Sequence, residues 1–162
     1  MSKRNIRVEE VTIADTDEVA VLIGKLLGEI MQVIGENVFD FDCGRSANQL
    51  RQFLDMGRYN AFIARNHAER IIGVITLSES CALYAGGRFG TIPEFYVEPE
   101  YRSQGVGSAL ADAARAHARS CAWSRLEVTT PPLPQFERTL AFYEAQGFSL
   151  AGGRKLKWEV QP

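Results

Sequence analysis

The sequence predicts an α/β (α+β) fold in a single domain over residues 1–162, with a mixed, largely antiparallel central sheet and helices on both faces. Short apolar runs separated by turn residues between positions 60 and 98 indicate an antiparallel meander. Amphipathic helical patterns precede and follow this meander. A length of 162 residues suits one domain with its own core.

The chain opens with a strand and a helix. Ile6 to Ile13 alternates apolar and polar residues, as a half-buried strand does. Asp15 and Glu18 have the spacing of a capping box, which predicts a helix N-terminus at that point. Apolar residues then recur at helical spacing as far as Ile30, so we expect an amphipathic helix.

A connection and a second helix follow. Gly35 to Gly44 shows neither the helical nor the strand periodicity of apolar residues and is expected to be a loop. Ser46 with Gln49 has a second capping-box pattern, and Gly57 stands where a C-terminal cap belongs. We therefore expect the second helix to begin at Ser46.

The meander contains three expected strands, Ala61 to Ala64, Ile71 to Leu77 and Phe89 to Val97. Turn residues at 66–69 and the pair Gly86-Gly87 separate them. A helix is expected to begin at Val106 and to reach Cys121 with an alanine-rich apolar face.

Three strands and a helix are expected after that. Arg125 to Thr129 has a strand pattern, and a proline-rich link leads to a helix from about Gln135 to Gln146. Gly147 followed by Phe148 is typical of a helix C-terminal cap with its apolar contact. Phe148 to Ala151 and Lys155 to Val160, joined through a pair of glycines, predict a closing β-hairpin.

Composition narrows the class of protein. A hydrophobic content of 46% and a charged content of 23% are ordinary for a soluble globular domain. A net charge of −2 argues against a nucleic-acid partner. Cys43, Cys81 and Cys121 are odd in number and widely spaced, so we expect reduced, buried thiols. The sequence has no signal-peptide pattern and no long apolar run, so we expect a cytoplasmic protein with no membrane contact.

Thr91 to Leu110 predicts a strand, a glycine-containing turn and a helix N-terminus, which is a site for an anion such as phosphate. The sequence lacks the G-x-x-x-x-G-K-[ST] string of a P-loop. A dinucleotide fingerprint would need a third glycine where Leu110 stands, although Glu127 offers an acidic residue at a suitable distance. The preceding antiparallel meander also disfavours that fingerprint, which opens a parallel βαβ unit.

Two separated motifs point to one family. The segment Phe95 to Arg102 reads FYVEPEYR, and RSQGVGS continues it from Arg102 to Ser108. The RSQGVGS segment resembles the [RQ]-x-x-G-x-[GA] pyrophosphate loop of the GNAT family of acetyl-CoA-dependent N-acetyltransferases. Ala141 to Phe148 reads AFYEAQGF and resembles that family's A-x-x-Y-x-x-x-G-F segment. The expected order of elements over nearly the whole chain is also similar to that of the family.

The resemblance implies acetyl-CoA as co-substrate, with its pyrophosphate on the turn and its pantetheine arm along the preceding strand. The implied cofactor-binding residues are Phe95, Tyr96, Val97, Arg102, Ser103, Gln104, Gly105, Val106, Gly107 and Ser108. Glycine at positions 105 and 107 would let phosphate oxygens approach the backbone closely. Arg102 could instead be an ordinary surface residue.

The resemblance also implies two catalytic residues. Glu94 occupies the position of a general base that takes a proton from the amine, with Glu127 as the second choice. Glu94 could instead be a solvent-facing strand residue or a binding group for a cationic substrate. Tyr143 occupies the position of a proton donor to the leaving CoA thiolate, although its place in an aromatic stripe also suits a core tyrosine.

The sequence departs from the family at one position. Phe136 stands seven residues before Tyr143, where many relatives have a cofactor-binding asparagine. The proline-rich link from Thr129 to Gln135 is also longer, so a contact from Thr139 is one alternative. We expect no metal site, because His67 and His117 have no neighbouring ligands in the sequence. Cys121 is expected to be a packing residue.

The acceptor is expected to be a primary amine of a small molecule, such as an aminoglycoside or a polyamine, that attacks acetyl-CoA directly in a ternary complex. An acidic, aromatic loop from Gly35 to Asp42 suits a cationic amine, although it also reads as an ordinary solvated loop. Acetylation of a peptide or protein N-terminus or lysine is an alternative, as is a non-catalytic acyl-CoA-binding module. A homodimer is expected by analogy.

Overall fold

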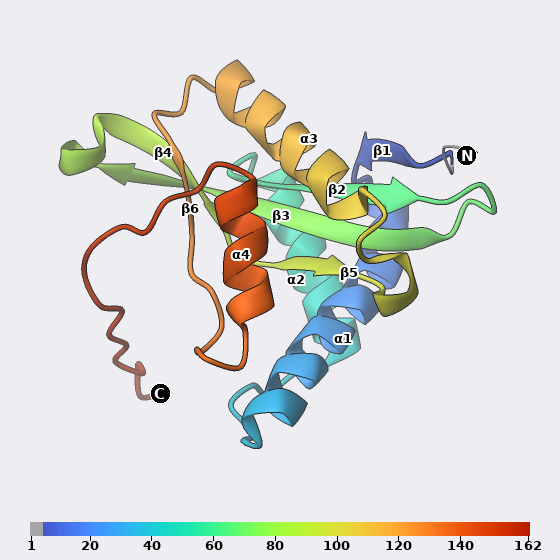
Figure 1. The fold of residues 1–162 in the computed structure, drawn as a ribbon, viewed down its shortest axis with the longest axis horizontal. Helices are drawn as coiled ribbons and strands as arrows, with labels where there is room; N and C mark the ends of the chain where they lie inside the picture. Colours follow the sequence, from blue (N-terminus) through green and yellow to red (C-terminus); the bar gives the residue numbers. More distant parts are fainter. Residues whose placement is uncertain (1–4) are drawn as a thin grey trace.

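The computed structural model describes residues 5–162 and contains a sheet with helices on both sides (Figure 1). The strands are β1 (Arg7–Glu10), β2 (Tyr59–Arg65), β3 (Ile71–Ala82), β4 (Gly87–Ile92), β5 (Phe95–Val97) and β6 (Leu126–Val128). Their order is β1-β2-β3-β4-β6, and β5 also pairs with β3. Every pairing is antiparallel except that of β4 with β6. The predicted mixed, largely antiparallel sheet is therefore confirmed.

Two pairs of helices cover the two faces. The helices are α1 (Thr16–Ile34), α2 (Cys43–Asp55), α3 (Val106–Ser120) and α4 (Glu137–Ala145). Val19 of α1 and Leu50 of α2 share one core cluster with Ile63 of β2. Leu110 of α3 shares the other with Ile75 of β3. In Figure 1, α1 and α2 lie on one face of the sheet and α3 and α4 on the other, so the two clusters are on opposite faces.

The predicted start of the first helix is confirmed, because Asp15 is the N-cap of α1, but the predicted capping box and the predicted start of the second helix are wrong. Asp15 does not cap a box with Glu18; its carboxylate accepts hydrogen bonds from Thr12 N at 2.8 Å and Thr12 Oγ1 at 2.9 Å, which closes a short 3-10 turn at residues 13–15. α2 begins before Ser46, because Asp42 is its N-cap and accepts from the backbone N–H of the third helical residue at 2.7 Å. In α2 a cap residue upstream of the predicted one therefore holds the first turn.

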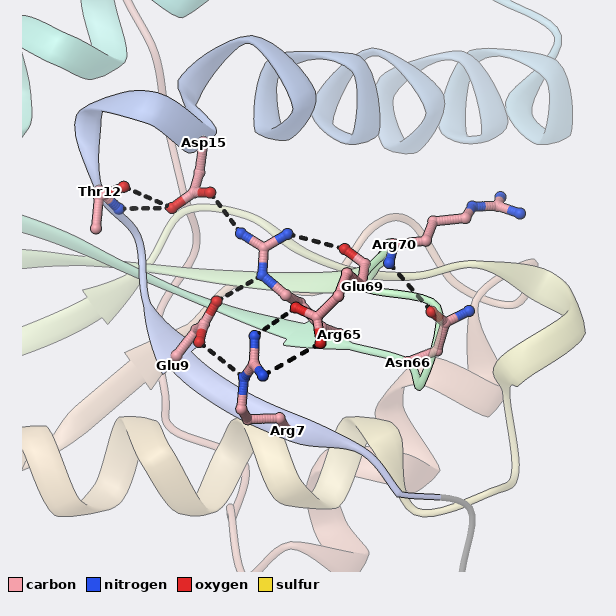
Figure 2. Close-up of polar contacts among 8 residues, drawn as sticks. All are labelled: Arg7, Glu9, Thr12, Asp15, Arg65, Asn66, Glu69 and Arg70. Carbon is pink, nitrogen blue, oxygen red and sulfur yellow. Dashed lines mark hydrogen bonds and ion pairs between the residues drawn. The ribbon is translucent and has the colours of Figure 1, made fainter.

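Figure 2 shows how the 3-10 turn at residues 13–15, which precedes α1, is linked to the sheet. Arg65 of β2 donates to Glu9 of β1 at 2.5 Å and to Asp15 at 2.5 Å. Burial alone would raise the pKa of the Asp15 carboxyl, but hydrogen bonds from Thr12 and Arg65 lower it overall. Hydrogen bonds from Arg65 and Arg7 also lower the pKa of Glu9. Ionised carboxylates therefore link β1, β2 and the start of α1.

The predicted strand Phe89 to Val97 is interrupted, so it forms two strands. β3 pairs Ser78 with Thr91 in β4 and Ile75 with Phe95 in β5. Between these two pairs, β3 has two residues, 76 and 77, whereas the segment that joins β4 to β5 has three, residues 92, 93 and 94. The extra residue makes a β-bulge around Pro93, which turns β5 away from the line of β4.

The end of α4 is confirmed, but the closing hairpin is wrong. Phe148 N donates to Tyr143 O at 3.0 Å and Gly147 N to Glu144 O at 3.0 Å, as in a Schellman motif. The rings of Phe148 and Tyr143 are 5.4 Å apart, which supplies the predicted apolar contact. Residues 149–162 form no strand and are exposed, and no strand within residues 5–162 pairs with them. Within residues 5–162, none of the helices is apolar over a length that would span a membrane.

Candidate functional site

A cleft of about 480 Å³ lies where β5 and β6 separate. The C-terminal half of α1, the turn before α3 and the body of α4 form its remaining walls. Of the predicted cofactor-binding residues, eight line it: Phe95, Tyr96, Val97, Arg102, Ser103, Gly105, Gly107 and Ser108. Gln104 and Val106 lie in the same turn without lining it.

The turn before α3 supplies unpaired N–H groups. Gly105 is the N-cap, and its φ of 85° is a left-handed conformation that favours glycine. Ala109 N donates to Gly105 O at 3.0 Å, so the N–H groups of residues 106–108 precede the first intrahelical bond. Gly107 serves packing: a Cβ there would lie 3.1 Å from the ring of Phe142. The positive end of α3 therefore faces the cleft, an arrangement that favours an anion.

Arg102 lies at the cleft, but its guanidinium already has partners. Its Nε donates to Val97 O at 2.8 Å, and its terminal nitrogens donate to the Glu29 carboxylate at 3.0 and 2.7 Å. The hydrogen bonds with Glu29 raise the pKa of Arg102 further above its ordinary value. The positive charge of Arg102 at the cleft is therefore balanced by Glu29 of α1, and this ion pair ties α1 to the turn.

β5 bonds to β3 through one edge and presents the other to the cleft. Glu94 O accepts a hydrogen bond from Thr76 N of β3 at 2.9 Å, and Glu98 N donates one to Ile72 O of β3 at 2.9 Å. Backbone groups of alternate residues in an antiparallel strand point to the same side. The N–H groups of Phe95 and Val97 consequently point toward the cleft, and among the described residues β6 pairs with β4 rather than with this edge.

The carboxylate of Glu94 is held by two hydroxyl groups that sequence reasoning missed. Tyr59 Oη donates to Glu94 Oε2 at 2.5 Å, and Thr76 Oγ1 donates to the same oxygen. Thr76 Oγ1 also accepts from Glu94 N at 2.9 Å. Burial, and then the charge of Glu94, raise the pKa of Tyr59, so its hydroxyl stays protonated as a donor. Glu94 Oε1 remains for another partner.

One signal in the sequence pointed to this arrangement. Thr76 is a polar residue inside the apolar run Ile71 to Leu77, and it is 1% exposed. A buried hydroxyl needs a hydrogen-bond partner, so its presence indicates a polar group across the sheet. Tyr59, which is distant in sequence, carried no such signal.

Glu127, the second candidate base, lies on β6 and pairs with Arg125 at 3.1 Å. Neither Glu127 nor Glu94 is among the residues that line the cleft. Glu127 stands opposite Thr91 in the parallel β4–β6 pair, a strand away from Glu94. The geometry therefore places Glu94, rather than Glu127, next to the bulge of β5.

Tyr143 lines the cleft from α4. It is 6% exposed, and its ring packs against Phe95 at 6.1 Å and Phe142 at 5.6 Å between centroids. Within residues 5–162 the Tyr143 hydroxyl has no hydrogen-bond partner, and no side-chain oxygen in that range is fully buried without one. The Tyr143 hydroxyl must therefore be accessible from the cleft that this residue lines. Burial raises the pKa of Tyr143, which keeps it protonated. Phe136 and Thr139 also line the cleft.

The loop proposed for acceptor binding has partly structural roles. Asp42 caps α2, and Asp40 pairs with Arg45 at 3.2 Å. The ring of Phe41 lies on Gly24 of α1, where a Cβ would be 2.5 Å from it. Glu36 and Phe39 are exposed. The acidic character of this loop is therefore retained at its outer positions.

The histidines take no part in the cleft. His117 packs between Phe62 and Trp123, with ring centroids 5.6 and 5.3 Å away, and its Nε2 is 3.4 Å from Cys121 Sγ. In the part of the chain that the structure describes, no three His, Cys, Asp or Glu side chains gather as metal ligands. The expectation of buried cysteines is wrong, because Cys43 and Cys81 are exposed.

Comparisons with known proteins agree with this geometry. Residues 57–150 match the sequence profile of the acetyltransferase (GNAT) domain. No curated protein matches the chain significantly in sequence. Many solved structures are similar in fold.

Three of them illustrate the range. An aminoglycoside acetyltransferase from an uncultured soil metagenomic sample has a TM-score of 0.75 at 16% identity, over 96% of this chain and 97% of its own. A ribosomal-protein-alanine N-acetyltransferase from Brucella melitensis has a TM-score of 0.68 at 20% identity, over 96% of this chain and 98% of its own. Glucosamine-6-phosphate N-acetyltransferase from Arabidopsis thaliana has a TM-score of 0.73 at 13% identity, over 95% of this chain and 98% of its own.

Proposed function

The chain belongs to the GNAT family of acetyltransferases, enzymes that use acetyl-CoA as co-substrate, and from this premise we propose that it acetylates a primary amine of a small molecule. The amine attacks the thioester directly in a ternary complex. One observation carries the proposal: the cleft runs from the N-terminus of α3, along the unpaired edge of β5, to Tyr143. The carboxylate of Glu94 lies at the bulge that opens this edge.

The cleft suits acetyl-CoA in shape and chemistry. The N–H groups of residues 106–108 and the positive end of α3 receive the pyrophosphate. The free edge of β5 receives the pantetheine arm, which carries amide groups that bond like those of a strand. Arg102 adds positive charge beside the pyrophosphate when it turns from Glu29. The thioester supplies an activated acetyl group.

Backbone N–H groups on β5 stabilise the charge of the transition state. The N–H groups of Phe95 and Val97 point toward the cleft from a strand fixed on β3. One of them donates to the thioester oxygen, on which negative charge develops as the amine attacks. Donors that are already in place cost no rearrangement during the reaction.

Glu94 takes the proton that the amine loses. Tyr59 and Thr76 both donate to Oε2, so the carboxylate is oriented while Oε1 stays available to the amine or to a water between them. The proton passes from the amine nitrogen to this carboxylate, directly or through that water. Tyr143 donates its hydroxyl proton to the departing CoA sulfur, and burial keeps that proton in place until then.

A cationic small molecule is the acceptor class that the charges favour. Glu94 is half-buried beside β5, and Glu36 and Asp40 are exposed on the loop that follows α1. Carboxylates around a site raise the local concentration of cationic amines. An aminoglycoside-like or polyamine-like amine meets this description, and one protein of similar fold is an aminoglycoside acetyltransferase.

The test is CoA release, followed with a thiol reagent, across a panel of aminoglycosides, polyamines, amino sugars and N-terminal peptides. We expect turnover with a cationic small amine. Glu94→Gln should then lose turnover and keep its affinity for acetyl-CoA, whereas the matched variant Glu127→Gln should stay active. Full activity in Glu94→Gln would remove Glu94 as the base, and turnover with peptides alone would move the acceptor to proteins.

A further inference from the structure

The side chain of Arg102 lies across the cleft-facing edge of β5. Its Nε donates to Val97 O at 2.8 Å. Val97 O is on the same edge as Val97 N–H, because both backbone groups of one residue in an antiparallel strand point to the same side. The guanidinium also lies over the Tyr96 ring, 5.4 Å from its centroid. Arg102 therefore covers the end of the edge on which the pantetheine arm is proposed to bind.

The Glu29 carboxylate offers Arg102 the same pair of oxygens that a phosphate group would. Arg102 Nη1 donates to Glu29 Oε1 at 3.0 Å and Arg102 Nη2 donates to Glu29 Oε2 at 2.7 Å. Carboxylates and phosphates both match the planar donors of a guanidinium in this bidentate way, so they compete for them. Both residues line the cleft together with Gly105, the N-cap of α3. Glu29 therefore occupies donors that a pyrophosphate in the cleft would use.

The pair of Glu29 and Arg102 is not what holds α1 on the sheet. α1 runs alongside β5 (Figure 1). One turn before Glu29, Lys25 forms an ion pair with Glu98, whose side chain is 5% exposed, and Leu26 packs on a core cluster. The side chains of Glu29 and Arg102 are 34% and 42% exposed, and ion pairs as exposed as this contribute little to stability. α1 should therefore stay in place when this pair is broken.

We propose that Glu29 is a built-in competitor of the cofactor and sets the affinity for acetyl-CoA. Before the cofactor binds, Glu29 holds Arg102 on the Val97 carbonyl. The pyrophosphate then takes the Nη donors of Arg102 from Glu29, and the pantetheine arm takes the Val97 carbonyl from Arg102 Nε. After acetyl transfer, Glu29 recovers Arg102 and so favours the departure of CoA. This inference rests on the proposed placement of acetyl-CoA in the cleft.

Titration calorimetry with CoA tests the competition. Glu29→Gln removes the charge and keeps the length of the side chain. We expect this variant to bind CoA about two- to fivefold more tightly, the range for loss of an exposed ion pair. Damage to the fold would instead weaken binding.

Glu18→Gln is the matched control, because it removes an equal charge from an exposed position on the same helix and should leave the affinity unchanged. Equal or weaker CoA binding by Glu29→Gln would overturn the competition while the cofactor site itself stands. If the native chain binds no CoA, both the cofactor site and the competition are wrong.

A second variant separates competition from simple repulsion between the Glu29 carboxylate and the pyrophosphate. Arg102→Met should weaken CoA binding, and adding Glu29→Gln to it should have no further effect, because the contested donors are gone. If Glu29→Gln tightens binding by the same factor with and without Arg102, the carboxylate acts by repulsion alone and the proposal is wrong.

The rate of CoA release tests the last step. In stopped-flow displacement, CoA should leave Glu29→Gln about two- to fivefold more slowly than it leaves the native chain, in proportion to the gain in affinity. An equal rate of release from the two proteins would overturn the recovery of Arg102 by Glu29.

Discussion

Tyr59→Phe is the most informative single change at the proposed base. It removes the hydroxyl that donates to Glu94 Oε2 at 2.5 Å and leaves the ring that packs on Phe53 at 5.3 Å between centroids. Tyr59 does not line the cofactor cleft. The substitution therefore acts on the orientation of Glu94 and leaves the proposed acetyl-CoA contacts in place.

The contacts give the size of the effect. A hydrogen bond to a charged group contributes about 1.5–3 kcal/mol. The low end applies, because Thr76 still donates to the same carboxylate oxygen. A loss of about 1.5 kcal/mol in transition-state stabilisation corresponds to roughly a tenfold fall in kcat. The KM for acetyl-CoA should not change.

The assay is steady-state CoA release with the amine identified by the panel. Tyr84→Phe is the matched control, because Tyr84 is 78% exposed and its ring lies under Arg125, far from the bulge of β5. Thr76→Ser, which keeps a hydroxyl, should retain most activity, whereas Thr76→Val should fall as Tyr59→Phe does. An unchanged kcat in Tyr59→Phe, or a change confined to the KM for acetyl-CoA, would refute the positioning of Glu94 by this hydroxyl.

Three further predictions address the donor, the packing and the electrostatics. Tyr143→Phe should lower kcat far more than acetyl-CoA affinity in titration calorimetry, and equal kcat would end its role as proton donor. Gly90→Ala should destabilise the fold by about 1–3 kcal/mol in urea unfolding, because a Cβ there would lie 2.3 Å from the Trp123 ring; unchanged stability would show that the ring moves freely. Folding lowers the pKa of Asp15, so its ionised carboxylate stabilises the fold above the ordinary pKa of an aspartate, and this stability is lost as the pH falls through the lowered pKa. Arg65→Met should therefore reduce the loss of stability in acid, measured by urea unfolding at a series of pH values. An identical loss in the variant would contradict the Arg65 contact.

Features set by neighbouring residues were predictable from the sequence. The turn at Gly105 depends on one left-handed glycine before a helix, and its conformation follows locally. The cap after α4 likewise needs only Gly147 and the contact of Phe148 with Tyr143. The two capping boxes failed because Asp42 and Thr12 offered competing caps a few residues upstream.

Features that join distant segments were not predictable in the same way. Tyr59 meets Glu94 across 35 positions of sequence, and only the β2–β3–β5 pairing brings them together. The bulge at Pro93 depends on how β3 pairs with two strands in turn. The predicted closing hairpin relied on the alternation of residues 155–160, but alternation alone supplies no pairing partner, and residues 149–162 form no strand.

Mass spectrometry of the amine after incubation with acetyl-CoA tests the central claim most directly. We expect one acetyl group on a primary amine of a cationic small molecule, with one CoA released for each product and no product from Glu94→Gln. Binding of acetyl-CoA without an acetylated product from any amine of the panel would contradict acetyl transfer and leave a module that binds acyl-CoA.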